Sequence, residues 1–340
     1  MNREVNTILN NTKETQRDYL FDNLRAIFII LVVLGHVLTS MIGQSDVIKS
    51  IYYFVFFFHM PALTFISGYF SKNLEKSRAT TFESLLLPYL FLNIITYIYK
   101  LTIIGEGYFG FRAFKPLWGL WYLLALFLWK FFLKDLVRIR YILPLSFLIA
   151  ILSGYSKEFS KYMALGRLLC FLPFFLLGYY CTKEHIDKIR KIPKLVSVAI
   201  LAGAGILSIY LLRVKIFGVG ILYLWKPYQR KSSNYEEMLY RILVYVVAIA
   251  ITVAIITLVS RKKSFLSQIG RNTMTVYIFH LFTIPILEKL EILKGQPYLY
   301  MLYSIPMTAI IVYLFSRPMA KKIYDTGMNR LTSFVMKKSI

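Results

Sequence analysis

Long apolar runs recur along the 340-residue chain, and they constrain the fold more than any other feature. A run of about 17 or more apolar residues is long enough to cross a hydrocarbon core of about 30 Å. Because lipid offers the backbone no hydrogen-bond partners, a spanning element is a helix or part of a closed barrel. The runs are continuous rather than alternating, which favours helices. The chain is 57% hydrophobic and only 17% charged, so we expect an all-α, polytopic integral membrane protein.

The apolar runs predict about ten transmembrane helices. The fifth of these is short for a span, and it fits either a weakly tilted or a partly re-entrant segment. The three expected regions are a cytoplasmic N-terminal segment (1–17), a transmembrane domain (18–320) and a basic cytoplasmic C-terminal tail (321–340). The helices are expected at 26–44, 51–70, 84–103, 118–134, 141–153, 166–181, 193–213, 239–259, 273–290 and 299–316.

The formal net charge of +24 indicates membrane orientation rather than nucleic-acid binding. The basic residues form short clusters between the apolar runs, as the positive-inside rule requires. Alternate segments hold 26 of the 41 Lys and Arg residues, which predicts that both termini lie in the cytoplasm and that nucleic acid is not a partner. These segments are 1–25, 71–83, 130–140, 182–194, 260–272 and 317–340.

The first apolar run carries two ionisable groups, Arg25 and His36, eleven residues apart. Eleven residues make about three helical turns and about 16.5 Å of rise, so the two side chains lie on nearly the same helix face. We expect Arg25 at the cytoplasmic surface, with Asp22 one turn earlier to orient it or pair with it, and His36 near mid-bilayer. An ionisable group at that depth marks a functional site by default.

Two more histidines, His59 and His280, lie midway along other predicted helices. The unperturbed pKa of imidazole is near neutrality, which suits proton transfer. A lone histidine in a membrane helix can also simply hydrogen-bond a neighbouring helix, so both readings stay open for these two. Three histidines can bind zinc. However, no helix supplies two histidines four residues apart, so we expect no metal.

The longest predicted extracytoplasmic loop, 213–238, is rich in aromatic and charged residues that suit sugar contacts. The same composition is typical of the aromatic belt that membrane proteins place at the interface. The residues in question are Trp225, Tyr228, Arg230, Tyr235 and Glu236.

Several motifs, in order along the chain, resemble those of the membrane acyltransferase-3 family, and specifically its fucose 4-O-acetylase-like, polysaccharide O-acetyltransferase branch. The first is an Arg, ten residues, then a His, from Arg25 to His36. The second includes His59 and Ser67. The matching stretches are 22–36, 57–69, 87–90, 118–123, 166–179 and 269–280.

The resemblance implies a ten-helix membrane enzyme that moves an acyl group, commonly acetyl, from cytoplasmic acyl-coenzyme A to an extracytoplasmic sugar. It implies that Arg25 and His36 are the central pair, with Asp22, His59, Ser67 and His280 in support. Where the family often has basic residues before the third helix, this chain has Thr81 to Ser84. Lys76 and Arg78, a turn or two earlier, are the candidates for coenzyme binding in their place.

Arg25 is suited to a phosphate or to the thioester carbonyl of acetyl-CoA, because its planar fork makes bidentate contacts. His36 is expected to act as a general base toward the acceptor hydroxyl or as a transient acyl carrier. Trp118, Trp121 and Arg167 are the candidates for holding the acceptor, although the two tryptophans also fit interfacial anchors.

The function expected from these residues is O-acetylation of a cell-surface or lipid-linked glycan, such as a capsule or exopolysaccharide. The protein would work among the lipids of a bacterial plasma membrane. A glycan exporter or flippase with a histidine proton relay is the alternative. Transporters of that kind usually have paired halves or broken helices at corresponding positions, and the sequence has no such internal symmetry.

Overall fold

The computed structural model describes residues 18–105, 113–160, 164–214, 219–228, 234–293 and 295–336. Within these ranges the chain is helical and contains no strand, which confirms the all-α fold class. The α-helices are α2 (Leu20–Leu38), α3 (Asp46–Tyr69), α4 (Leu74–Thr81), α5 (Leu87–Tyr99), α6 (Trp121–Leu136), α7 (Ile142–Leu152), α8 (Leu165–Tyr180), α9 (Lys183–Ile189), α10 (Lys194–Arg213), α11 (Asn234–Leu258), α12 (Phe265–Arg271), α13 (Thr273–Lys289), α14 (Pro297–Phe315) and α15 (Pro318–Val335).

Short 3₁₀ and π segments extend or connect these helices. The π segments lie on either side of α5, so that α4 to the second π segment forms one continuous apolar stretch, Leu74–Ile104. The 3₁₀ segments are η1 (Thr39–Met41), η4 (Trp118–Leu120), η5 (Ser153–Tyr155), η6 (Glu158–Ser160) and η7 (Val219–Ile221), and the π segments are η2 (Phe82–Leu86) and η3 (Lys100–Ile104).

Every one of the ten predicted segments is helical. Among the described residues, six helical stretches are long and apolar enough to cross a membrane, and a seventh is added if α8 and α9, bent by 99°, form one broken span. The fifth predicted helix, α7, has only 11 residues, in keeping with its short apolar run. A multi-pass membrane protein is therefore supported, while a count of ten full spans stays a prediction.

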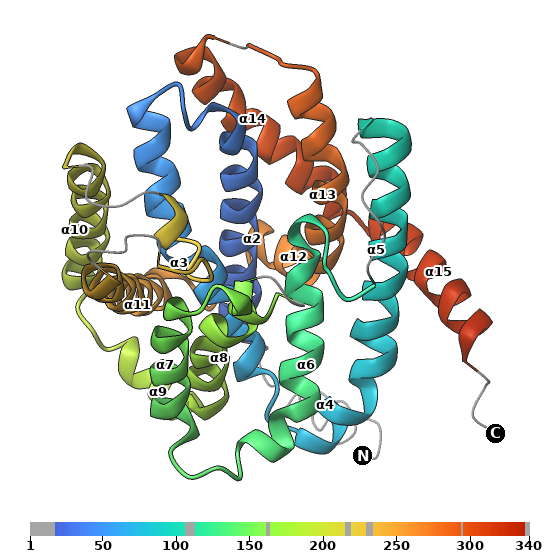
Figure 1. Ribbon diagram of the computed structural model, residues 1–340, viewed down its shortest axis with the longest axis horizontal. Helices are drawn as coiled ribbons and strands as arrows, with labels where there is room; N and C mark the ends of the chain where they lie inside the picture. Colours follow the sequence, from blue (N-terminus) through green and yellow to red (C-terminus); the bar gives the residue numbers. More distant parts are fainter. Residues whose placement is uncertain are drawn as a thin grey trace, which may run out of the picture.

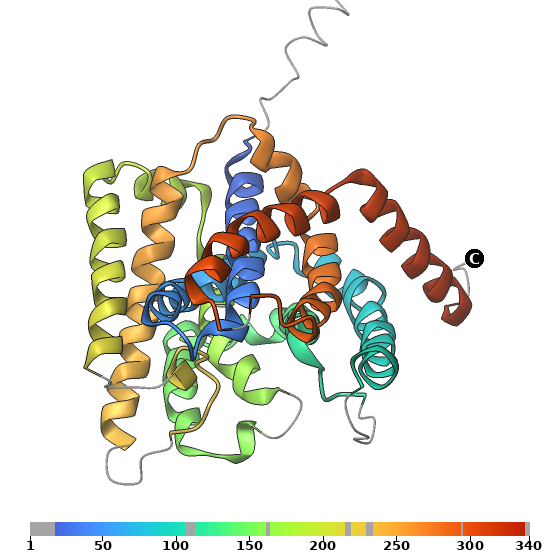
Figure 2. The same ribbon diagram turned by 90° about the horizontal axis from the view of Figure 1, so that it is seen from above.

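The sequence analysis did not predict α4, α9, α12 or α15 as helices. All four are polar or mixed in composition, so they carry no long apolar run. The C-terminal region that we expected to be a basic tail is mostly helical, because α15 continues to Val335. In Figures 1 and 2 this helix lies at the edge of the bundle, and it contacts α5.

The first long helix, α2, lies in the middle of the bundle, where it contacts α3, α12, α13 and α14 (Figure 1). Its residues Leu20, Leu24, Phe28 and Val32 recur every four positions and are all buried, as a stripe facing the core requires. The helix begins at Leu20 rather than at 26. The tertiary structure explains the earlier start, because Asn23 donates hydrogen bonds to the carbonyl oxygens of residues 260 and 262.

Helices α3 and α8 pack closely because each presents a glycine to the backbone of the other. A Cβ added at Gly68 would lie 1.9 Å from the carbonyl oxygen of Phe175, and one added at Gly178 would lie 1.9 Å from that of Phe65. Small residues of this kind allow membrane helices to approach each other. This close contact lies near the C-terminal ends of both helices.

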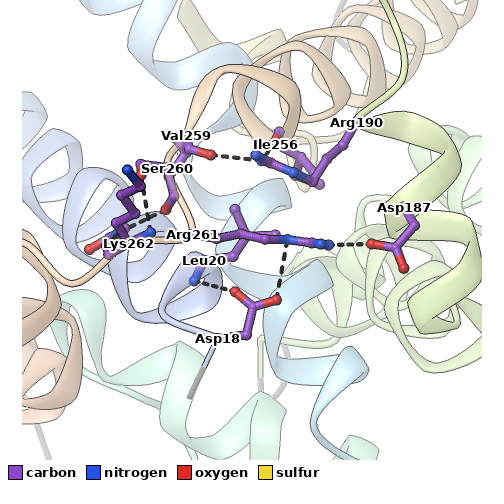
Figure 3. A network of polar contacts seen from close by, with 10 residues as sticks. Asp18, Leu20, Asp187, Arg190, Ile256, Val259, Ser260, Arg261 and Lys262 are labelled. Atoms are coloured by element: carbon purple, nitrogen blue, oxygen red, sulfur yellow. Dashed lines mark hydrogen bonds and ion pairs between the residues drawn. The ribbon is translucent and has the colours of Figure 1, made fainter. Parts of the chain in front are cut away.

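Residues from three of the predicted cytoplasmic segments meet in one polar network (Figure 3). Arg261 forms ion pairs with Asp187 and with Asp18, the latter at 3.3 Å between Nε and Oδ2. Arg190 donates to the carbonyl oxygens of Ile256 and Val259 at 2.6 and 2.7 Å, and so covers the C-terminal end of α11. We refer to these residues as the Arg261 network.

The predicted extracytoplasmic connections meet at the opposite end of the helices. The hydroxyl of Ser40, after α2, is 2.9 Å from that of Tyr300, near the start of α14. Tyr228 donates to the carbonyl oxygen of Ile151, near the end of α7, at 2.8 Å. These connections and the Arg261 network thus lie at opposite ends of the helix bundle, as the charge pattern predicts. Which of the two ends faces the cytoplasm stays a prediction.

Candidate active site

A cavity of about 360 Å³ lies among the helix ends opposite the Arg261 network. Its wall comes from α2, α3, α6, α8 and α13, from η1 and η4, and from the segment around η7. These elements are far apart in the sequence, so only the packing of the bundle brings their side chains together. The polar or aromatic residues of the wall include His36, Thr39, Tyr52, Phe56, His59, Trp118, Trp121, Arg167, Tyr223, Trp225, Tyr277, His280 and Glu288.

His36, His59 and His280 all line this cavity. The rings of His36 and His280 are 5.3 Å apart between centroids, and His36 is close enough to His59 to interact with it electrostatically. His59 and His280 lie near the middle of their helices. His36 is two residues before the end of α2, because that helix ends at Leu38, six residues earlier than predicted. His36 therefore lies near the end of α2, whereas a mid-bilayer position was expected.

The tautomers of His59 and His280 follow from their hydrogen bonds. The Nδ1 atom of His59 is 2.8 Å from the carbonyl oxygen of Val55, and that of His280 is 3.0 Å from the carbonyl oxygen of Val276. A carbonyl oxygen only accepts hydrogen bonds, so Nδ1 carries the proton in both rings. Each Nε2 therefore keeps a lone pair, and that of His280 is buried without a partner among the described residues.

Among the described residues, no group of three or more His, Cys, Asp and Glu side chains could hold a metal ion. That the protein uses no metal stays a prediction. An unpartnered Nε2 on a ring whose Nδ1 is already engaged is the arrangement that a general base requires.

Arg167 lies between two indole rings in the cavity wall. Its Cζ atom is 4.5 Å from the ring centroid of Trp225 and 5.2 Å from that of Trp121. Trp121 also packs on Phe171, with 5.1 Å between ring centroids, and its side chain is buried. Both Trp121 and Arg167 line the cavity; that they hold the acceptor stays a prediction. An outward-facing interfacial anchor does not describe Trp121.

Trp118 also lines the cavity, and its backbone has a φ of 45°. This left-handed conformation is uncommon for a bulky residue and persists only where the surroundings impose it. The next residue, Gly119, lies so close to α13 that an added Cβ would be 2.7 Å from the side chain of Leu281. This packing fixes η4, which turns the Trp118 ring toward the cavity.

Arg25 and Asp22 do not line the cavity. Arg25 lies 3.9 Å from Asp22 between charged atoms and packs on the ring of Phe70 at 4.3 Å, so the expected pairing of Arg25 with Asp22 is present. Asp22 is also 3.7 Å from Arg271. The two residues lie about three helical turns from His36, toward the Arg261 network.

Ser67 also lies outside the cavity wall, but it is connected to it through two tyrosines. Its hydroxyl is 2.9 Å from that of Tyr122. The ring of Tyr122 is 6.0 Å from that of Tyr277, and the ring of Tyr277 is 6.0 Å from that of His280. These side chains form a polar path between the Arg25 end of α2 and the histidines.

Lys76 and Arg78 lie on the exposed face of α4, away from the cavity. Arg78 is 3.4 Å from Asp135 and packs on the ring of Phe131 at 4.9 Å. Their helix is joined to α6 by a second ion pair, between Glu75 and Lys134 at 2.6 Å. They occupy the same end of the bundle as the other predicted cytoplasmic segments.

Of the five residues named in the long loop, only Trp225 lines the cavity among those that the structure describes, and Arg230 lies outside the described residues. Tyr228 packs against Gly154, and Tyr235 is exposed. No periodic pattern marks Trp225, so the sequence could not separate it from its aromatic neighbours.

The sequence analysis gave no role to Tyr277, Glu288, Tyr52 or Tyr223, which also line the cavity. A signal existed for Tyr277, because it precedes His280 by three residues and so shares its helix face. The hydroxyls of Tyr52 and Tyr223 are 2.9 Å apart, a contact between residues 171 positions apart that no local pattern predicts.

Comparison with known proteins gives one match. A family model for an acyltransferase domain, that of acyltransferase-3, matches residues 18–317. The matched range includes every residue named in the cavity and in the Arg261 network. No curated protein and no solved structure matches the chain.

Proposed function

Because the chain belongs to the acyltransferase-3 family, we propose that it transfers an acetyl or related acyl group from acyl-coenzyme A to a hydroxyl of a cell-surface or lipid-linked glycan. Membership of the family implies acyl transfer, and the apolar helices fit a membrane enzyme. The observation that carries the finer proposal is the convergence of His36, His59 and His280 in one aromatic cavity.

In the proposed reaction, an imidazole Nε2 takes the proton of the acceptor hydroxyl as its oxygen attacks the thioester carbonyl. Collapse of the tetrahedral intermediate breaks the carbon–sulfur bond, forms the ester and returns the proton to the departing thiol. His36 is our candidate for the base, since it lies beside His280. Properly placed general bases accelerate such reactions by about 10²–10⁴-fold.

The donor is proposed to enter from the end that contains Arg25. Coenzyme A is polyanionic and carries its thioester at the end of a long flexible arm. Arg25, with Lys76 and Arg78 on the same end, suits its phosphates because arginine and lysine bind phosphate oxygens. Ser67, Tyr122 and Tyr277 lie along the route that the arm would take to His36.

The acceptor is proposed to enter from the opposite end, where Trp118, Tyr52 and Tyr223 line the cavity. Their aromatic rings offer apolar faces for a sugar ring, and the tyrosine hydroxyls offer hydrogen bonds. With the protein in a bacterial plasma membrane, a capsule, an exopolysaccharide or a lipid-linked oligosaccharide would fit this acceptor entrance equally.

The test is to replace His36 with alanine in cells and to measure both the amount of surface glycan and its O-acetyl content. We expect O-acetylation to be lost while the glycan yield stays normal. His185→Ala is the matched control, because His185 is the remaining histidine and lies in α9, outside this cavity.

Two outcomes of this experiment would contradict the proposal. Unchanged O-acetylation in the His36→Ala strain would exclude His36 from the reaction. A lower amount of surface glycan with unchanged acetylation per sugar would instead indicate a glycan exporter or flippase that uses the histidines to relay protons.

A further inference from the structure

The guanidinium of Arg167 is held in the cavity wall in an unusual state. The side chain is enclosed by the protein, yet it keeps an intermediate accessible surface because it borders the cavity. Among the described residues it makes no hydrogen bond and no ion pair; its recorded contacts are the two indole rings. Its charge is therefore left without an anion on the protein side.

An enclosed guanidinium without an anion is energetically costly unless a ligand supplies the anion. Taking a cation out of water is costly, and attraction to an aromatic face offsets only part of that cost. The contacts of the guanidinium with Trp121 and Trp225 are with ring faces, which supply no oxygen atom. The guanidinium carries five N–H donors in one plane, and oxygen atoms are what they bind.

The other charged residues near the cavity do not supply those oxygens. Glu288 is the one carboxylate among the described residues of the wall, and no ion pair joins it to Arg167. It lies in the last turn of α13 and is exposed. The neighbouring tyrosines, Tyr223 and Tyr277, have their hydroxyls engaged with Tyr52 and with the carbonyl of Gly119.

The position of Arg167 decides which substrate would meet it. It is the third residue of α8, at the end of the bundle opposite Arg25 and the Arg261 network. In the proposed function the coenzyme phosphates stay near Arg25, whereas the acceptor enters beside Arg167. An anion at Arg167 would therefore belong to the acceptor.

Resting on the proposed function, we infer that Arg167 binds an oxyanion of the acceptor, so that the acceptor glycan is acidic. A planar carboxylate, as in a uronic acid, matches the guanidinium edge with two parallel hydrogen bonds; a sugar phosphate offers the same chemistry. The contacts with Trp121 and Trp225 hold the guanidinium in the cavity wall, beside the space that the acceptor would occupy.

The experiment measures binding of three simple probes to the detergent-solubilised full chain, using the intrinsic fluorescence of the tryptophans that flank Arg167. The probes are methyl β-glucuronide, its neutral counterpart methyl β-glucoside, and glucose 1-phosphate. We expect the glucuronide or the phosphate to bind about 10- to 100-fold more tightly than the glucoside, since charged hydrogen bonds are the stronger ones. The tighter of the two anions identifies the acidic group.

The same probes are then measured on Arg167→Gln and on Arg213→Gln, a matched control at the exposed end of α10 and outside the cavity. We expect the preference for the anion to disappear in the first variant and to remain in the second. If Arg167→Gln does not fold, the comparison of charged and neutral probes on the unaltered protein still tests the inference.

Equal binding of the charged and neutral probes to the unaltered protein would overturn the inference. So would an anion preference that survives Arg167→Gln. If the probes bind equally while His36→Ala still abolishes glycan acetylation, the acidic acceptor is wrong and the acyl transfer stands. If the anion preference is present but His36→Ala leaves acetylation intact, the binding site stands and the proposed reaction falls.

Discussion

In the Arg261 network the arginines form ion pairs or hydrogen bonds within the protein, whereas Arg167, in the cavity at the other end, forms neither among the described residues. Arg261 contacts two aspartates, and Arg190 donates to two backbone carbonyls. In the cavity, Arg167 has only aromatic neighbours among the described residues, and Nε2 of His280 has no partner there. Both regions are polar, and both belong to a bundle of mainly apolar helices.

The structural and the functional polar groups of this protein therefore differ in whether they have partners, and not in their residue types. A polar group whose hydrogen bonds are complete stabilises the fold, while an unpartnered buried group carries a desolvation cost of about 1–3 kcal/mol. Native structures retain few such groups, and they mark sites where a ligand or a reaction uses them. The comparison therefore predicts that variants at the two ends fail in different ways.

The largest expected effect comes from His280→Asn. The asparagine amide can still donate to the carbonyl oxygen of Val276, but it has no atom in place of Nε2. Because the His280 ring lies beside His36, the candidate base, we expect its loss to lower acyl transfer by as much as about 10²–10⁴-fold with no change in thermal stability. Measured activity and melting temperature of the purified protein check this. A large drop in melting temperature would show that His280 stabilises the fold rather than takes part in the reaction.

Arg190→Met should show the opposite pattern. It removes two hydrogen bonds from a charged donor to the end of α11, each worth about 1.5–3 kcal/mol at most. We expect a lower melting temperature and an unchanged turnover number. Arg213→Met, at an exposed helix end, is the control and should leave the melting temperature unaltered. Loss of turnover in folded Arg190→Met protein would mean that the Arg261 network takes part in the reaction.

Arg25→Gln tests a residue at the same end of the bundle as the Arg261 network. We expect the Michaelis constant for acetyl-CoA to rise about tenfold, which corresponds to about 1.4 kcal/mol, with little change in turnover. Arg271→Gln is the matched control, because Arg271 contacts the same carboxylate of Asp22. An equal rise in both variants would assign the effect to Asp22 rather than to coenzyme binding.

The smallest effect is expected for Ser67→Ala. It removes one hydrogen bond to Tyr122, worth about 0.5–1.5 kcal/mol, so acyl transfer should fall by no more than about tenfold. Tyr122→Phe should lose the same interaction. Combining the two substitutions should then cost no more than the larger single effect. Additive losses would place the two side chains in separate roles.

Much of the fold was predictable because helix formation in a membrane is a local property. Each apolar run meets its own hydrogen-bonding needs, so length and hydropathy alone located all ten predicted helices. The ends were less accurate. Leu20 rather than residue 26 begins α2 because Asn23 binds a loop more than 230 residues away. The short polar helices α9 and α12 carry no apolar run and were missed.

The candidate site was predictable in part for the same reason. Histidines are conspicuous in apolar helices, and all three that the sequence analysis selected line one cavity. Arg25 was expected to act as a pair with His36, yet it lies outside that cavity. The helical period puts both residues on one face of α2, but the cavity occupies only one end of that face.

The sequence by itself determined that the chain folds into apolar helices, and it indicated which polar residues those helices carry. Only the tertiary structure decided which of those residues meet. Tyr223 and Trp225 reach the histidines from a connecting segment whose path no periodicity fixes. The Arg167 guanidinium lies against rings from positions 121 and 225. Contacts between such distant residues depend on how helices pack, and packing is a property of the whole bundle.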